Sequence, residues 1–260
     1  MTACDPKQTS QGAGCRLNMN DKNNIPWPRI GVEAVAILVS ILLAFAIDAW
    51  WENRKDRAFE QETLHGLKAE YLGHRVSITR HKEFNIKSLR AIASLMGACR
   101  NGLFQSTEFT IDTAVGLLLV EITTELGSGV RDALISAGRI DLLRDRKLRS
   151  MLSEWDSVLD EVTDGQIFNR NMIQVSVIPH LVRLNIPMSD AMSEFGETPW
   201  PFPTQSISSD PEMTKRLIED PEICTLLDIR YGNMNHTLDE IDDLIVAIDE
   251  MLEQIDASIE

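Results

Sequence analysis

Residues 30–51 read IGVEAVAILVSILLAFAIDAWW and determine how the rest of the chain is interpreted. All but one of the residues from 34 to 47 are apolar, with Trp27 before them and Trp50-Trp51 after them. A helix rises about 1.5 Å per residue, so it separates these Trp edges by roughly 35 Å. This length matches a bilayer's hydrocarbon core with its edges, where Trp side chains concentrate. The stretch predicts one transmembrane helix over 30–51, with Trp27, Trp50 and Trp51 as membrane-edge anchors.

Two other interpretations of this helix stay open, a buried core helix and a cleaved signal peptide. Residues 1–29 are rich in Asn, Gln, Gly, Ser and Thr, and they predict a disordered tail because they hold little that could form a core. A tail of this length before the apolar run disfavours the signal peptide.

One face of the predicted span is not lipid-like. Glu33, Ala36, Ser40, Ala44 and Asp48 follow one another at intervals of three and four residues and so line one stripe of a helix. Small residues on such a stripe let two helices approach closely in lipid. The stripe is either a helix–helix interface or a face whose two acids reach the headgroups, and the sequence supports both interpretations equally.

The charge of the chain is unevenly distributed. The sequence holds 25 Lys+Arg and 40 Asp+Glu, a net charge of −15, while residues 1–51 are neutral overall. Residues 52–260 therefore carry the whole negative charge. A chain this acidic is unsuited to a phosphate backbone, so we expect no nucleic-acid binding.

Residues 52–260 predict an acidic α-helical domain, because apolar residues recur near a period of 3.6 and no strand-like alternation occurs. The predicted span continues into a charged helix. Gly165 is expected to interrupt the chain between helices, and 185–211 is the longest expected loop. The further expected helices are 84–100, 111–126, 130–137, one that starts at Asp145, 167–184 and a long C-terminal helix.

The C-terminal helix has the clearest pattern. From Asp239 to Glu260 it carries nine acids and no base, whereas residues 52–100 hold ten bases and six acids. Packing this helix against 52–100 would bury its apolar stripe and pair its charges, so we expect an all-α antiparallel bundle closed by a heptad-patterned helix. A self-associating coiled coil is disfavoured by the acids. The stripe comprises Leu227, Tyr231, Met234, Leu238, Ile241, Ile245, Ile248, Leu252, Ile255 and Ile259.

Few residues suggest chemistry. Glu62 and His65 match one Glu-x-x-His element of di-metal bundles, which require two copies and further Glu residues. We therefore predict no metal, cofactor or catalytic residue. Cys99 and Cys224 either pair or remain buried thiols, and we favour the thiols.

Two segments resemble an uncharacterised bacterial family of single-span membrane proteins. The first is Val32-Glu33, the apolar run and IDAWWENRK over 47–55, although the family has Gly where this chain has Val32. The second is ALISAGRIDLL over 133–143, and the acidic final helix is also similar. The resemblance implies a membrane-anchored α-helical domain with no assigned activity.

These observations together predict a non-enzymatic scaffold or sensor that acts through protein partners. The expected partners are the lipid bilayer and either another protein or a second copy bound through the transmembrane helix, while no small-molecule ligand can be identified. Bases flank the span on both sides, so charge gives no orientation. A short tail before an uncleaved span favours a large domain on the extracytoplasmic side of the bacterial cytoplasmic membrane. The alternative is a helical-bundle metalloenzyme with a Glu/His site in its core.

Overall fold

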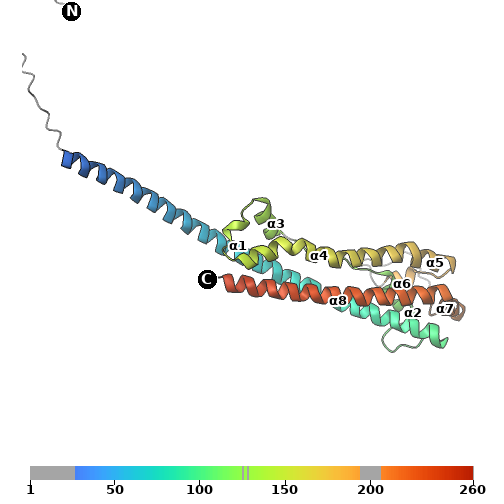
Figure 1. The fold of residues 1–260 in the computed structure, drawn as a ribbon. Helices are drawn as coiled ribbons and strands as arrows, with labels where there is room; N and C mark the ends of the chain where they lie inside the picture. Colours follow the sequence, from blue (N-terminus) through green and yellow to red (C-terminus); the bar gives the residue numbers. More distant parts are fainter. Residues whose placement is uncertain (1–26, 125, 128, 194–205, 260) are drawn as a thin grey trace, which may run out of the picture. The chain divides into compact units, whose positions relative to one another are not determined.

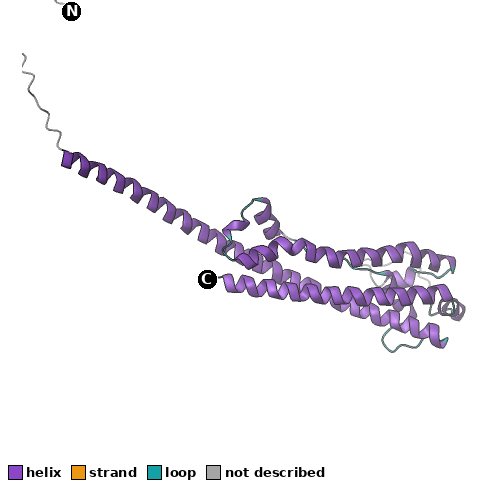
Figure 2. Cartoon of the chain, viewed as in Figure 1, coloured by secondary structure: helices purple, strands orange, loops and turns teal. Residues whose placement is uncertain are grey.

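The protein is all-helical in the residues that its structure, a computed structural model, describes, namely 27–124, 126–127, 129–193 and 206–259. No strand occurs among these residues (Figures 1 and 2). The predicted all-α class is therefore confirmed. The α-helices are α1 (Trp27–Asn101), α2 (Ile111–Leu119), α3 (Gly129–Ser136), α4 (Arg146–Met172), α5 (Ile178–Arg183), α6 (Ser189–Ser193), α7 (Pro211–Ile218) and α8 (Pro221–Ser258).

The chain divides into two compact units, Met1–Lys55 and Asp56–Glu260. The helix α1 continues through this boundary without a break. Residues 1–26 of the expected tail lie outside the described residues, and α1 begins at Trp27, three residues before the predicted span.

The second unit has two apolar clusters, each built from α1, α8 and segments between them. In one cluster, residues 64–78 of α1 share a core with α8 residues 241–255 and with Trp155 of α4. In the other, residues 91–98 of α1 share a core with 223–234 of α8, with α2 and with the segment after α4. Figure 1 shows α1, α4 and α8 side by side over this length.

The buried face of α8 differs in part from the predicted stripe. Every second stripe residue is fully buried, and the residues between them, such as Tyr231 and Leu252, are only half-buried. Most of the other buried positions of α8 lie one residue before a half-buried stripe residue, and they include the polar Arg230 and Thr237. The difference arises because α8 packs against two neighbours, so its buried face is wider than one seam.

The expected pairing of the acidic last helix with the basic segment is confirmed. Three ion pairs join α1 to α8, and from one pair to the next the α1 partner lies seven residues later and the α8 partner seven residues earlier, which keeps them on one side of each helix. Each is partly exposed, so it contributes little stability singly. The pairs are Lys68–Asp256 at 2.7 Å, Arg75–Asp249 at 2.7 Å and Lys82–Asp242.

Two predicted helix boundaries are wrong. No break separates the membrane-side helix from 84–100, because the chain has no Pro there and residues such as Ile78 and His81 bury one face. Gly165 does not interrupt α4 either. A Cβ at this position would lie 2.5 Å from Glu240 Oε2 and 3.2 Å from Thr237 Oγ1, so the glycine permits close approach to α8.

Helix α2 ends at Leu119 rather than at residue 126, where the sequence predicted its end. Val120 has extended backbone angles (φ −100°, ψ 132°), and residues 120–124 hold four β-branched side chains, which disfavour a helix. The backbone N–H of Thr124 donates instead to Gln166 Oε1 of α4 at 2.7 Å. The extended stretch 120–124 thus becomes part of the core.

Other predicted boundaries are confirmed. Asp145 caps α4, with its carboxylate accepting from the backbone N–H of Leu148 at 3.0 Å. Gly138 follows α3 with φ +64°, which suits a helix end. The expected loop 185–211 contains α6, and its residues 194–205 lie outside the described residues.

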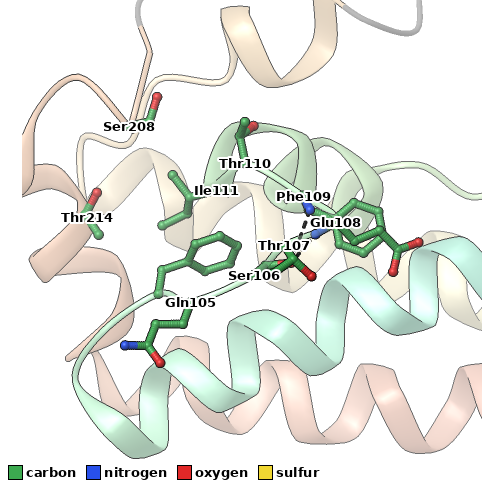
Figure 3. A pocket seen from close by; sticks show the side chains of 10 residues that line it. Gln105, Ser106, Thr107, Glu108, Phe109, Thr110, Ile111, Ser208 and Thr214 are labelled. Atoms are coloured by element: carbon green, nitrogen blue, oxygen red, sulfur yellow. Dashed lines mark hydrogen bonds between the residues drawn. The ribbon is translucent and has the colours of Figure 1, made fainter.

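At the end of α1 the chain forms a loop, 102–110, before α2. This loop, the first turn of α2 and residues Ser208 and Thr214 line a wide-open surface cavity of about 890 Å³ (Figure 3). Asp112 of α2 links α2 to the segment that contains Ser208. Its carboxylate accepts hydrogen bonds from the backbone N–H groups of Ile207 at 2.6 Å and Ser208 at 3.0 Å. Burial raises the pKa of Asp112, but these bonds and two from Ser206 and Ser208 side chains outweigh it and lower that pKa.

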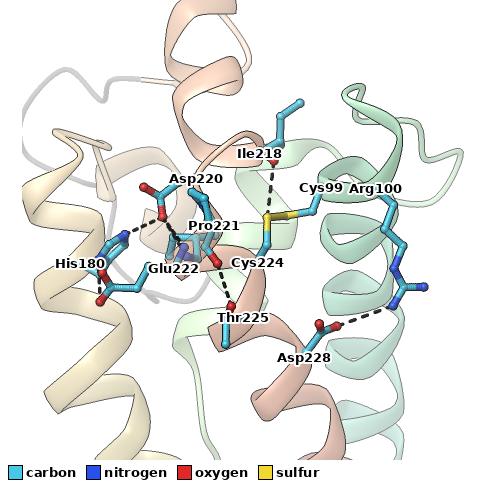
Figure 4. Close-up of a disulfide and its surroundings, with 11 residues drawn as sticks. Cys99, Arg100, His180, Ile218, Asp220, Pro221, Glu222, Cys224, Thr225 and Asp228 are labelled. Carbon is cyan, nitrogen blue, oxygen red and sulfur yellow. Dashed lines mark hydrogen bonds and ion pairs between the residues drawn. A yellow bond between two sulfur atoms is a disulfide. The ribbon is translucent and has the colours of Figure 1, made fainter.

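Cys99 and Cys224 form a disulfide, which corrects the expectation of buried thiols. The bond joins the last turn of α1 to the first turn of α8 across 125 residues of sequence (Figure 4). The Cα atoms lie 6.0 Å apart, within the usual range for a disulfide. Beside it, the buried His180 is 2.8 Å from Asp220, which caps α8.

Candidate functional site

The first candidate is the apolar segment of α1. All residues from 31 to 51 are exposed, and the large apolar side chains among them are 47% to 69% exposed. The helix is long and apolar enough to cross a membrane, by length and composition. A helix that presents apolar side chains on all sides is unfavourable in water and suited to hydrocarbon.

The five stripe residues lie together on this exposed segment. Glu33, Ala36, Ser40, Ala44 and Asp48 are all exposed to what surrounds the helix. The hydroxyl of Ser40 donates to the backbone carbonyl of Ala36 at 2.7 Å. This bond satisfies the only hydroxyl within the apolar run, so Ser40 can face lipid or another helix without an unpaired donor.

The C-terminal edge of the segment carries two aromatic–cation contacts. The rings of Trp50 and Trp51 lie 6.3 Å apart. The guanidinium of Arg54 is 5.8 Å from the Trp50 ring, and the ammonium of Lys55 is 5.7 Å from the Trp51 ring. Rings with adjacent cations suit the headgroup level of a membrane. Trp27 opens α1, but its side chain lies outside the described residues.

A second candidate, which sequence reasoning missed, is a polar layer in the second unit. It lies at the border of the two apolar clusters, and its side chains come from α1, the stretch 120–124, α4 and α8. Its signal in the sequence is a polar residue three positions after each of two apolar stripe residues, Leu227 and Met234. The layer comprises His81, Asn85, Ser88, Glu121, Thr124, Gln166, Asn169, Arg230 and Thr237.

Hydrogen bonds connect this polar layer across helices. Gln166 donates to Thr124 Oγ1 at 2.7 Å, and that hydroxyl lies 3.1 Å from His81 Nδ1. Asn169 of α4 donates to Thr237 Oγ1 of α8 at 3.1 Å. Burial lowers the pKa of His81 despite a backbone hydrogen bond that raises it, so its ring is neutral at pH 7.

The layer also contains a buried ion pair between Arg230 and Glu121. The Arg230 side chain is 0% exposed and that of Glu121 is 1% exposed. Arg230 Nη2 donates to Glu121 Oε2 and lies 3.4 Å from the carbonyl of Val120. Burial raises the pKa of Glu121 more than the Arg230 charge lowers it.

The layer is incompletely satisfied. Each buried polar atom without a partner costs about 1–3 kcal/mol. A π-helical segment, Ile173–Val177, follows directly, and such segments are frequent at functional sites. The layer is therefore a weak point between two well-packed clusters. Its buried atoms without a hydrogen-bond partner in the described structure are His81 Nε2, Ser88 Oγ, Glu121 Oε1, Asn169 Oδ1 and Arg230 Nε and Nη1.

The structure places Glu62 and His65 on the exposed side of α1 rather than in the core. Within the described ranges, no three or more His, Cys, Asp or Glu side chains are grouped to hold a metal ion. The pair is thus placed away from the bundle core that a di-metal site would require.

No protein-family model, curated protein or solved structure matches this chain.

Proposed function

We propose that the protein is a single-span protein of the bacterial cytoplasmic membrane whose helical unit acts outside the cytoplasm as a non-enzymatic scaffold or sensor for a protein partner. One observation carries the proposal: the apolar side chains of residues 31–51 are exposed on all sides of the helix. Burying such a surface in lipid is favourable by about 25 cal/mol per Å².

The architecture in this proposal is an antiparallel bundle. Residues 64–78 of α1 pack with 241–255 of α8, and 91–98 pack with 223–234, so the sequence order is opposite in the two helices. The seven-residue interval of the three ion pairs supports a heptad arrangement. Within the second unit, residues 56–101 of α1 would span about 70 Å of this bundle.

The disulfide supports the location of the helical unit. Disulfides persist in oxidising compartments such as the bacterial periplasm and are rare in the cytosol. The bond between Cys99 and Cys224 therefore favours an extracytoplasmic unit. The bacterial membrane assignment itself comes from the resemblance of the residues around 47–55 and 133–143.

An exposed apolar face supports a protein partner. Phe168 of α4, Val175 of the π-helical segment and Val182 of α5 are 58%, 75% and 57% exposed and lie seven residues apart in the sequence. Between 167 and 182 the sequence has Arg170 as its only Lys, Arg, Asp or Glu. Interface cores are depleted of charge in the same way.

Membrane fractionation tests the anchor. We expect the protein to remain in the membrane pellet after high-salt and alkaline washes, because apolar burial is not screened by salt. Deleting residues 30–51 should release a helical protein into the soluble fraction. Release of the full-length chain by salt alone would contradict a membrane span.

The stripe in the span should contribute to self-association. Replacing Ser40 with Leu inserts a bulky side chain where helices would approach closely, and we expect partial loss of a contact of about 0.6–2 kcal/mol. Cross-linking in membranes measures the dimer fraction. Leu42→Ala on the opposite face is the matched control. Equal cross-linking of all three proteins would show that the stripe faces lipid.

The apolar face formed by Phe168, Val175 and Val182 should be needed for partner binding. Val175→Asp places a charge in the middle of this face, and we expect loss of the proteins that cross-link to the wild-type chain in membranes. Val76→Asp is the control, since Val76 is 61% exposed on α1. Identical cross-linked products from both variants and the wild type would place the partner elsewhere.

A further inference from the structure

The open cavity beside the loop 102–110 has walls of fixed geometry. Ser106 Oγ accepts from the backbone N–H groups of Glu108 at 3.2 Å and Phe109 at 3.1 Å, which closes a tight turn. Across the cavity, Thr214 Oγ1 donates to the carbonyl of Ile207 at 3.3 Å. Figure 3 shows Ser208 and Thr214 on one side and the residues from Gln105 to Thr110 on the other.

Its lining combines many hydroxyl groups with little charge. Five of the ten lining residues are Ser or Thr, and Gln105 adds an amide. The only ionisable side chain in the lining is Glu108, whose carboxylate lies 3.7 Å from Arg90 outside the lining. A lining of this kind offers paired donors and acceptors but no excess charge to hold an ion.

The hydroxyl groups differ in whether they can still donate or accept a hydrogen bond. The Ser106 oxygen already accepts two bonds, so its O–H can donate outward. Thr214 donates within the protein, so its lone pairs can accept. Thr107 and Gln105 are exposed, and both can donate and accept. Ligands that alternate donors and acceptors match this arrangement.

Phe104, Phe109 and Ile111 are the apolar residues of the lining, and Phe104 is the least buried of them. Phe104 is half-buried and packs against the apolar cluster that contains α2, so its ring is held in place while part of it faces the cavity. A fixed aromatic face binds flat C–H surfaces, which a sugar ring presents while its hydroxyls point sideways.

We propose that this cavity is a binding site for a neutral polyhydroxylated ligand, namely a saccharide of two to three units. Its volume of about 890 Å³ lies within the usual range of 300–1,000 Å³ for ligand sites. An acyl chain would require a mostly apolar lining, and an ionic ligand would require an unpaired opposite charge. The proposal does not depend on the membrane anchor or on the partner-binding face.

Calorimetric titration with maltotriose and chitotriose tests the site. The full-length protein is kept in a detergent without a sugar headgroup, because glycoside detergents would compete. We expect saturable binding of at least one trisaccharide below about 10 mM. Phe104→Leu keeps apolar bulk but removes the aromatic face, and should weaken binding roughly tenfold. Thr107→Val removes one hydroxyl at nearly constant size and should weaken binding roughly three- to tenfold.

Leu103→Ala is the matched control, because Leu103 lies in the same loop, is 55% exposed and does not line the cavity. It should bind as the wild type does. Unchanged circular dichroism shows that each variant is folded. No binding of either sugar by the wild type would overturn the proposal, as would equal affinities in Phe104→Leu, Thr107→Val and the wild type. Binding of neutral tripeptides with the same variant sensitivity would reassign the cavity to peptides.

Discussion

Removing the Cys99–Cys224 disulfide should lower the free energy of unfolding of the helical unit by about 4–5 kcal/mol. The bond closes a loop of 125 residues, and loop-closure entropy lost from the unfolded chain grows with that length. For a unit of this size the loss corresponds to a fall in melting temperature of about 10–20 °C. The large value follows from the position of the bond, which joins the end of α1 to the start of α8 (Figure 4).

Chemical unfolding of the full-length chain, followed by circular dichroism, measures this loss. Cys99→Ser/Cys224→Ser is compared with the wild type, both oxidised and reduced. Cys4→Ser/Cys15→Ser is the matched control, since it removes the chain's other two cysteines and should leave stability unchanged. Equal stability of oxidised and reduced wild type would mean that the bond does not form. Thiol blocking in intact cells separately reports the compartment, because an extracytoplasmic unit should offer no free thiol at 99 or 224.

The pairing of the cysteines shows where sequence reasoning stops. Cys99 and Cys224 lie 125 residues apart, and no local pattern places the end of one helix beside the start of another. Their proximity depends on the lengths of α1 and α8 and on how the two helices align. The sequence predicted two separate helices in the basic segment 52–100, where the structure has the single helix α1. The position of Cys99 relative to α8 therefore could not be predicted.

The apolar periodicity of the sequence predicted the helices and part of the buried face of α8. Stripe residues such as Ile241 and Ile248 are buried, and the acids around them meet bases of α1. The pattern failed where polar residues are buried. Arg230 and Thr237 are polar, so their side chains would be expected to face solvent. They are instead 0% and 2% exposed, because α4 and the stretch 120–124 cover them.

The exposed segment of α1 could be predicted because its signal is local. Every residue needed for the interpretation lies between Trp27 and Trp51, and no distant contact changes it. The cavity lining, by contrast, combines the loop 102–110 with Ser208 and Thr214 about a hundred residues later. Neither segment alone carries a motif, so only the fold reveals the cavity.

Replacing Glu121 with Leu should cost about 3–5 kcal/mol of stability. The substitution leaves the guanidinium of Arg230 buried without its anionic partner, and an uncompensated buried charge is expensive. The carbonyl of Val120, 3.4 Å away, offers only a dipole in place of a charge. Urea unfolding of the full-length chain measures the loss. A stability equal to that of the wild type would contradict a tightly buried pair.

The double variant Glu121→Leu/Arg230→Met separates the cost of a lone charge from the value of the pair. Both partners then become apolar with similar volume, and most of the lost stability should return. The exposed pair Arg75–Asp249 provides the matched cycle, in which Asp249→Leu should cost about 0–1 kcal/mol. Additive losses in the Glu121 and Arg230 variants would show that the two groups do not interact.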